Sequence, residues 1–168
     1  DKISGCNALD KVLIDKNIPE YEKKIQELET MLHKLGVDIL VDENVSEILP
    51  NETQVKDNNI WYEEFLDYKI LIGEIASNQD TIAMINKYSG GHSSVIVTTD
   101  EDEAKRFMEN VDTAAVYHNA STRFTDGGQL GLGGELAIST DKLHQRGPIG
   151  LQHLVTNKWY VHGNGQIR

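Results

Sequence analysis

Residues 68–98 read YKILIGEIASNQDTIAMINKYSGGHSSVIVT and combine three elements in a row. The apolar run 68–75 predicts a strand, and residues 78–88 predict a helix with apolar residues on one face. The glycines at 90–91 would end that helix, and the β-branched run 94–98 predicts the next strand. A strand, a helix and a strand in succession are typical of a largely parallel sheet.

The same alternation continues toward the N-terminus. Residues 11–15 predict a strand, and the helix after it would be capped by Asn17, with Pro19 in its first turn. Apolar residues recur three and four positions apart along this helix, and Gly36 would end it. Residues 37–41 predict a short strand that follows directly.

The remaining segments complete an α/β pattern. Residues 43–59 are acidic and polar, and we expect a loop there. Residues 100–110 predict a helix with acidic residues in its first turn, where the helix dipole favours them, and residues 114–117 predict a strand. From about Asp141 the chain has no obvious place in a compact sheet, so a β-like run at 159–162 would form an exposed edge. We therefore expect an α/β fold with a largely parallel sheet flanked by helices.

Composition limits the classes to which the chain can belong. Its 168 residues suffice for one domain, and 39% hydrophobic with 26% charged residues is ordinary for a globular protein. The net charge of −11 argues against nucleic acid and anionic membranes as partners, because both require basic patches. No apolar run reaches the ~18–20 residues that span a bilayer, and no signal peptide is evident. The first residue is not methionine, so we expect a fragment of a longer protein.

Residues 117–134 are the most glycine-rich part of the chain, with five glycines within eight positions. Glycine is typical where the backbone adopts unusual torsion angles or where a ligand approaches it closely. Arg123 and the neighbouring hydroxyl groups, next to bare amides, suit an anionic or carboxylate-bearing small molecule. A simple glycine-rich connector explains the composition equally well, because a single loop of this kind is a weak signal.

Cys6 is the only cysteine and lies among small residues before the strand predicted at 11–15. One cysteine excludes an internal disulfide and fits a reducing compartment, so we expect the protein in the cytoplasm. An exposed thiol can act as a nucleophile once it is a thiolate. An isolated cysteine is nevertheless more often an inert small hydrophobic residue.

Metal and dinucleotide motifs are not evident. The six histidines lack metal-site spacing and have no neighbouring cysteine, so we expect no bound metal. His92 is the one histidine that we consider as a pocket residue, and nothing in the spacing supports a hydrolase dyad with Cys6. The run Gly131-Leu-Gly133-Gly134 departs from the order G-x-G-x-x-G of dinucleotide-binding loops. We therefore expect no nucleotide-binding fold within the chain.

Five segments occur in an order that carries a resemblance. They are Gly5-Cys6-Asn7-Ala8-Leu9, Ile85–Ser93, Asn119–Gly128, Lys142–Leu151 and Gly163–Arg168. In this order they resemble the C-terminal part of the gamma-glutamyl phosphate reductases, a family within the aldehyde dehydrogenase superfamily. The resemblance covers essentially the whole chain and is most specific between residues 119 and 150.

This resemblance implies NADPH-dependent reduction of L-glutamyl 5-phosphate to L-glutamate 5-semialdehyde and phosphate, a step of proline biosynthesis. It implies that Cys6 is the catalytic nucleophile and forms a thioester with the substrate. It also implies that Glu64 reaches the nicotinamide ribose, with Phe65 beside it. The glutamyl group would be held by one loop, at residues Ser121, Thr122, Arg123, Thr125, Gly127 and Gly128.

The resemblance further implies a catalytic domain at 1–140 and a C-terminal tail at 141–168 with an oligomerisation strand. NADPH would be bound mainly by a nucleotide-binding domain absent from the chain, so we expect the isolated chain to be inactive and the protein to form a homo-oligomer. Two other interpretations stay open: another aldehyde dehydrogenase working oxidatively, or a dimerisation and substrate-loop module without activity. A thiol hydrolase is a more distant alternative.

Overall fold

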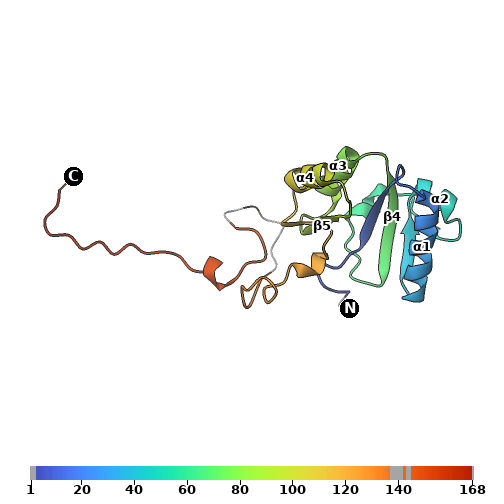
Figure 1. Ribbon diagram of the computed structural model, residues 1–168. Coiled ribbons are helices and arrows are strands. Elements are labelled where there is room, and N and C mark those ends of the chain that lie inside the picture. Colours follow the sequence, from blue (N-terminus) through green and yellow to red (C-terminus); the bar gives the residue numbers. More distant parts are fainter. Residues whose placement is uncertain (1–2, 137–141, 143–144, 168) are drawn as a thin grey trace.

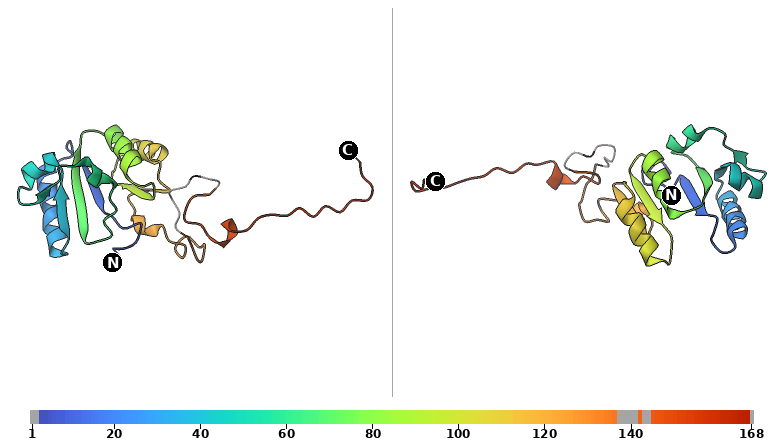
Figure 2. Two further views of the ribbon diagram at one scale, coloured as in Figure 1. Left: turned by 180° about the vertical axis from the view of Figure 1, so that it is seen from behind. Right: turned by 90° about the horizontal axis from the view of Figure 1, so that it is seen from above.

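The computed structural model describes residues 3–136, 142 and 145–167. Strands and helices alternate through a body that is followed by a long extended C-terminal segment (Figure 1). Both views of Figure 2 show that this segment points away from the body. Every strand pair in the described residues is parallel, and helices flank the strands. These features confirm the expected α/β fold.

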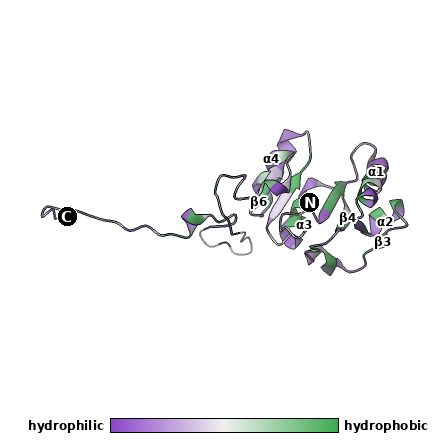
Figure 3. Ribbon diagram, turned by 90° about the horizontal axis from the view of Figure 1, so that it is seen from below, coloured by the Kyte–Doolittle hydropathy of each residue, from purple (hydrophilic) through white to green (hydrophobic). Residues whose placement is uncertain are grey.

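The larger sheet has four strands in the order β1-β4-β2-β3. Its central strand β4 is strongly apolar, and Ile70, Leu71 and Ile72 are buried in it (Figure 3). A continuous apolar run of this kind is typical of a parallel strand that is covered on both faces. The strands are β1 (Lys11–Asp15), β2 (Asp38–Val41), β3 (Thr53–Gln54) and β4 (Lys69–Ile75).

The core lies where helices α1 (Tyr21–Lys34) and α2 (Glu43–Ile48) pack against this sheet. Ile25 of α1 and Val45 of α2 are fully buried against apolar residues of β2 and β4. Full burial of one such side chain contributes about 1.5–3 kcal/mol. The apolar residues that recur three and four positions apart along α1 therefore pack against the sheet, as expected from the sequence.

A second, two-stranded sheet pairs β5 (Ser93–Ile96) with β6 (Ala115–His118). Helix α3 (Asn78–Tyr88) leads from β4 into this sheet, and α4 (Glu101–Asn110) connects its two strands (Figure 1). Asp100 caps α4 because its Oδ1 accepts from the amides of residues 102 and 103 at 3.0 Å. Within the described residues, the parallel strands are thus divided between two ladders.

The predicted start of α1 is wrong. Asn17 does not cap the helix, which begins at Tyr21 after Glu20, a residue with a φ of 57°. The Asn17 side chain instead donates to Oδ1 of Asp15 at 2.8 Å and to the carbonyl oxygen of Ala76 at 3.1 Å. These contacts join the segments that follow β1 and β4, which are adjacent in the sheet but distant in sequence.

The loop expected over 43–59 is also wrong, since it contains α2, β3 and the start of a 3-10 helix, η1 (Asn58–Tyr62). Asp42 caps α2 by accepting from the amide of Val45 at 2.8 Å. A helix of six residues is too short to show an amphipathic period. The buried side chain of Val45 is what holds this helix against the sheet.

The C-terminal segment is attached to the body through Arg146. Its guanidinium donates to the carbonyl oxygens of Gly91 at 2.9 Å and Asp112 at 3.0 Å, and to Oδ1 of Asp112 at 2.8 Å. Lys142 forms a second ion pair with Asp112. A further short 3-10 helix, η3 (Leu151–His153), precedes the extended end of the chain.

The extended end forms no strand between residues 154 and 167, although a β-like run was expected at 159–162. A strand requires a neighbouring chain to accept its backbone hydrogen bonds, and nothing in the body lies beside this segment (Figure 1). Trp159, Tyr160 and Val161 are 84%, 76% and 88% exposed, as expected for an unpaired edge. The domain boundary predicted at 140/141 lies outside the described residues. Across the described parts of the chain, every helix is too short or too polar to cross a bilayer.

Candidate functional site

Cys6 lies in a turn just before β1, and its side chain is exposed. A hydrogen bond of 2.8 Å from the amide of Ala8 to the carbonyl oxygen of Gly5 closes this turn. The exposed position of Cys6 does not favour the interpretation of this residue as an inert small hydrophobic one. A substrate can reach it.

Asn7, directly after Cys6, is buried and joins this turn to residues 122–125. Its Nδ2 donates to the carbonyl oxygen of Thr125 at 2.8 Å, and its Oδ1 accepts from the guanidinium of Arg123. Its own carbonyl oxygen accepts from the hydroxyl of Thr122 at 2.6 Å. The structure therefore brings the turn that carries Cys6 next to part of the predicted substrate loop.

The residues predicted to hold the substrate differ in what they offer to a ligand. Ser121, Arg123 and Gly128 are exposed, whereas Thr122, Thr125 and Gly127 are buried. The hydroxyl of Thr122 is donated to Asn7. A guanidinium has five N–H donors, and the contact with Asn7 uses one of those of Arg123.

Thr125 contacts side chains on both strands of the smaller sheet. Its Oγ1 forms a hydrogen bond with the hydroxyl of Tyr117 in β6 and lies 3.5 Å from Oγ of Ser93 in β5. Together with the short 3-10 helix η2 (Thr122–Phe124), these contacts fix the substrate loop against the smaller sheet. The arrangement gives the exposed residues of this loop a rigid support.

Three of the glycines after Thr125, at positions 127, 131 and 133, are required by the fold of the loop itself. A Cβ atom on Gly127 would lie 2.7 Å from the carbonyl oxygen of Gly133 and 2.9 Å from Cβ of Glu135. Gly131 and Gly133 have φ angles of +72° and +76°, which side chains rarely adopt. These constraints explain Gly127, Gly131 and Gly133 without a ligand, whereas an added Cβ on Gly134 would meet nothing within 4 Å.

Glu64 and Phe65 lie in the connection between η1 and β4. Nζ of Lys11 lies 4.8 Å from the centroid of the Phe65 ring, and Nζ of Lys69 lies 5.8 Å from it. Lys11 also donates to the carbonyl oxygen of Glu63. The Phe65 ring is thus held against β1 and β4, while the side chain of Glu64 is exposed. An exposed carboxylate beside a fixed ring suits the ribose hydroxyls of a nicotinamide nucleotide.

His92 is partly buried at the start of β5, and its Nδ1 lies 2.8 Å from Oγ of Ser93. Burial lowers the pKa of His92 below its usual 6.5, while the negative charges of Glu64 and Glu135 act in the opposite direction. His92 therefore lies within the electrostatic reach of both the predicted cofactor residue and the glycine-rich loop. Within the described residues, the hydrogen bond of the His92 ring is with Ser93 and not with Cys6, so the geometry gives no support to a hydrolase dyad of these two residues.

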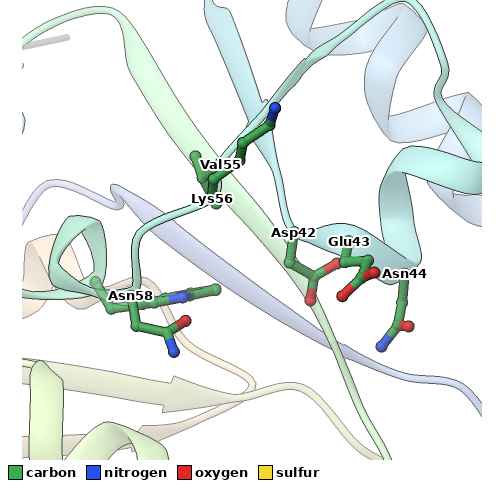
Figure 4. Close-up of a pocket in the computed structure, with 7 residues that line it drawn as sticks. Asp42, Glu43, Asn44, Val55, Lys56 and Asn58 are labelled. Atoms are coloured by element: carbon green, nitrogen blue, oxygen red, sulfur yellow. The ribbon is translucent and has the colours of Figure 1, made fainter.

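Cys6 and Glu64 precede β1 and β4, so both lie at the amino edge of the larger sheet. A cavity of 390 Å³ lies at the opposite edge and contains none of the predicted site residues (Figure 4). Asp42 in this cavity accepts from the amides of Val45 and Glu74, both at 2.8 Å, so its carboxylate serves the fold. Burial raises the pKa of Asp42. The cavity lining comprises Asp42, Glu43, Asn44, Val55, Lys56, Asn58 and Trp61.

One cluster of possible metal ligands was not expected from the sequence. Side-chain ligand atoms of Glu29, His33 and Glu52 lie within 4.8 Å of one another. Glu29 and His33 are one turn apart on α1, whereas Glu52 follows α2 and could not be placed there from spacing. Nε2 of His33 lies 2.8 Å from Oε1 of Glu52, and this pair accounts for the cluster without a cation.

The fold and the site define an α/β protein with parallel strands, an exposed thiol before β1 and a glycine-rich loop tied to that thiol's turn. A family model of the "Aldehyde dehydrogenase family" matches residues 53–159, more than half of the chain. The chain belongs to the aldehyde dehydrogenase family.

Individual relatives confirm the more specific resemblance. The gamma-glutamyl phosphate reductase of Dictyoglomus thermophilum is 46% identical over 165 residues, which cover 98% of this chain and 39% of the relative. That of Leptospira biflexa is 44% identical over 163 residues, 97% of this chain and 38% of the relative. The crystal structure of gamma-glutamyl phosphate reductase from Thermotoga maritima superposes with a TM-score of 0.91 at 40% identity, covering 99% of this chain and 40% of that chain. The chain thus spans about two fifths of the length of these relatives.

Proposed function

We propose that the chain is the catalytic part of an NADPH-dependent enzyme that reduces L-glutamyl 5-phosphate to L-glutamate 5-semialdehyde and phosphate. One observation carries this proposal: an exposed Cys6 sits in a turn that hydrogen bonds to residues 122–125, in a chain 46% identical to a gamma-glutamyl phosphate reductase. Membership of the family implies a nicotinamide cofactor. The choice of NADPH and a cytoplasmic location belong to the proposal.

The thiolate of Cys6 attacks the acyl carbon of the substrate. A carbon–sulfur bond forms, the bond between the acyl carbon and the phosphate oxygen breaks, and inorganic phosphate leaves. When bound, the cofactor supplies a hydride to the acyl carbon. The carbon–sulfur bond then breaks, which releases the aldehyde and restores the thiolate. The amide of Cys6 is a donor for the oxyanion that develops on the substrate.

The α-carboxylate of the glutamyl group is held by Arg123, with Ser121 and the amide of Gly128 as further donors. These three residues are exposed on a loop that the smaller sheet supports. A planar guanidinium with unused N–H donors matches a carboxylate, and the overall negative charge of the chain requires such a local cation. The three buried residues of this set fix the conformation of the loop and do not themselves bind the carboxylate. They are Thr122, Thr125 and Gly127.

The chain's own contribution to cofactor binding is Glu64, whose carboxylate accepts hydrogen bonds from the nicotinamide ribose. Phe65 fixes the course of the segment between η1 and β4, because its ring contacts the ammonium groups of Lys11 and Lys69. We propose that most of the NADPH surface is bound by a part of the whole protein outside this chain, which agrees with relatives more than twice as long.

The reverse reaction tests this proposal in the whole protein that contains the chain. L-glutamate 5-semialdehyde, inorganic phosphate and NADP⁺ are mixed, and formation of NADPH is followed by absorbance. We expect formation only when phosphate is present, because phosphate must cleave the thioester. Formation without phosphate would identify an oxidative aldehyde dehydrogenase instead, and no formation would identify a module without this activity.

A further inference from the structure

We propose that Asn7 is a positioning residue: it holds the backbone that carries Cys6 at a fixed place relative to Arg123. The proposal rests on the function proposed above, because it assigns Cys6 to the nucleophile and Arg123 to substrate binding. The hydrogen bonds of the Asn7 side chain are with Thr125 and Arg123 and not with the thiol. Asn7 acts through the segment 122–125.

Three hydrogen bonds carry the argument. Both ends of the Asn7 amide are engaged, with Nδ2 donating to Thr125 and Oδ1 accepting from Arg123, and its carbonyl oxygen accepts from Thr122. The residue is 8% exposed, so water does not readily replace these partners. Because Asn7 follows Cys6 directly, any shift of the thiol's backbone must break contacts on three residues of the loop.

Asparagine suits this place better than its close relatives. Aspartate keeps an acceptor for Arg123 but has no donor for the carbonyl oxygen of Thr125, and two oxygens would then face each other. Alanine loses both side-chain contacts. The pairing also fixes one N–H group of Arg123, so the guanidinium presents its remaining donors in a set direction.

The consequence is a fixed spacing between the cation that binds the substrate and the sulfur that attacks it. A nucleophile held at the correct distance reacts far faster than a mobile one, and a misplacement of about 1 Å can cost roughly 10²-fold in rate. A small alkylating reagent needs no such placement. Loss of Asn7 should therefore slow turnover while leaving the reaction of Cys6 with iodoacetamide nearly unchanged.

The experiment compares Asn7→Ala and Asn7→Asp with Thr113→Val in the whole protein. Thr113 is a matched control: it is also 8% exposed, and its hydroxyl donates to the carbonyl oxygen of Ala115 at 2.9 Å. We expect Asn7→Ala to lower kcat of the reverse reaction by about 10- to 100-fold, with a smaller change in KM. Alkylation of Cys6 per folded molecule should stay within about threefold. The control should lose stability without a change in kcat.

Asn7→Asp adds a pH signature that general destabilisation would not produce. A carboxylate next to Cys6 disfavours the thiolate, so the pH dependence of alkylation should move to higher pH in this variant and stay in place in Asn7→Ala. Wild-type kcat in Asn7→Ala, or an equal fall in turnover and alkylation, would overturn the positioning role.

Hydrogen exchange separates this inference from the proposed function. If the wild-type protein shows no turnover, the proposed function fails, and the positioning role is read from backbone amides instead. In Asn7→Ala the amides of Ala8 and Thr125 should lose protection together, whereas Thr113→Val should leave both unchanged. Unchanged protection of either amide in Asn7→Ala would overturn the inference by itself.

Discussion

A Cβ atom on Gly73 would lie 2.6 Å from Cη2 of Trp61, so β4 and η1 approach each other at a distance that only glycine permits. The same Cβ would lie 3.1 Å from Oδ2 of Asp42. Trp61 is buried, so a movement of the indole ring away from the strand would disturb its packing.

Gly73→Ala should therefore destabilise the fold. Forcing one methyl group into this contact is expected to lower the free energy of unfolding by about 1–3 kcal/mol. Urea unfolding followed by tryptophan fluorescence measures the change. Gly134→Ala is the control, because nothing lies within 4 Å of the added Cβ there. Equal stability of the two variants would show that Trp61 can rearrange.

Most of the fold could be predicted because its strands and long helices carry local signals. The apolar run of β4 and the spacing of Ala104 and Phe107 in α4 correspond to buried surfaces in the structure. Helix α2 could not be found this way, since six residues show no period and its position depends on burial of Val45. The start of α1 was misplaced because Asn17 bonds to the carbonyl oxygen of Ala76, a partner 59 positions away.

Single residues of the candidate site carry local signals in the sequence, but the hydrogen bonds that connect them do not. Cys6 and Arg123 are visible as a lone thiol and a cation beside glycines. Asn7 has no local signal, because its partners lie 115 to 118 positions further along the chain. The sequence also does not show which hydroxyl groups face inward. Ser121 and Thr122 are neighbours, yet only Thr122 donates its hydroxyl to Asn7.

Cys6→Ser should abolish most of the turnover in the whole protein. A serine hydroxyl is barely ionised at neutral pH, so the rate should fall by orders of magnitude. Because the Cys6 side chain is exposed, the free energy of unfolding should change by no more than about 0.5 kcal/mol. The assay is the phosphate-dependent formation of NADPH, with urea unfolding as the control. Near-wild-type turnover would remove Cys6 from the mechanism.

Arg123→Ala should raise KM for L-glutamate 5-semialdehyde much more than KM for NADP⁺. A charge-assisted contact with a carboxylate contributes roughly 1.5–3 kcal/mol, which corresponds to an increase of about 10- to 150-fold. Arg106→Ala is the matched control, because the Arg106 side chain is 62% exposed on α4 and, among the residues that the structure describes, forms an ion pair with its helix neighbour Glu103 at 3.5 Å. If both KM values rise together, Arg123 serves the fold of the loop rather than substrate binding.

The stability of the wild-type chain should fall as the pH is lowered from 7 through 6. Burial lowers the pKa of folded His92 below 6.5, so the unfolded state binds more protons in this range, and protonation favours unfolding. The negative charges of Glu64 and Glu135 raise the pKa of His92 and so limit the effect. In His92→Gln the contribution of this group is absent, so its unfolding free energy should depend less on pH between about 5 and 7. Parallel pH profiles for the two proteins would contradict the argument.

The exposed run Trp159–Val161 should mediate self-association, as the expected homo-oligomer requires. Complete burial of one aromatic side chain removes roughly 150–250 Å² from water. At about 25 cal/mol per Å², each buried side chain favours association by roughly 4–6 kcal/mol, before the entropic cost of ordering the segment is subtracted. The unpaired backbone of this segment offers a second chain a strand edge.

Light scattering over a range of concentrations should therefore show an oligomer for the wild-type chain and a smaller species for Trp159→Ser. Met31→Ser removes an exposed apolar residue from α1 and should leave the mass unchanged. A wild-type chain that stays monomeric at tens of micromolar, or a Trp159→Ser variant of wild-type mass, would refute this role of the segment.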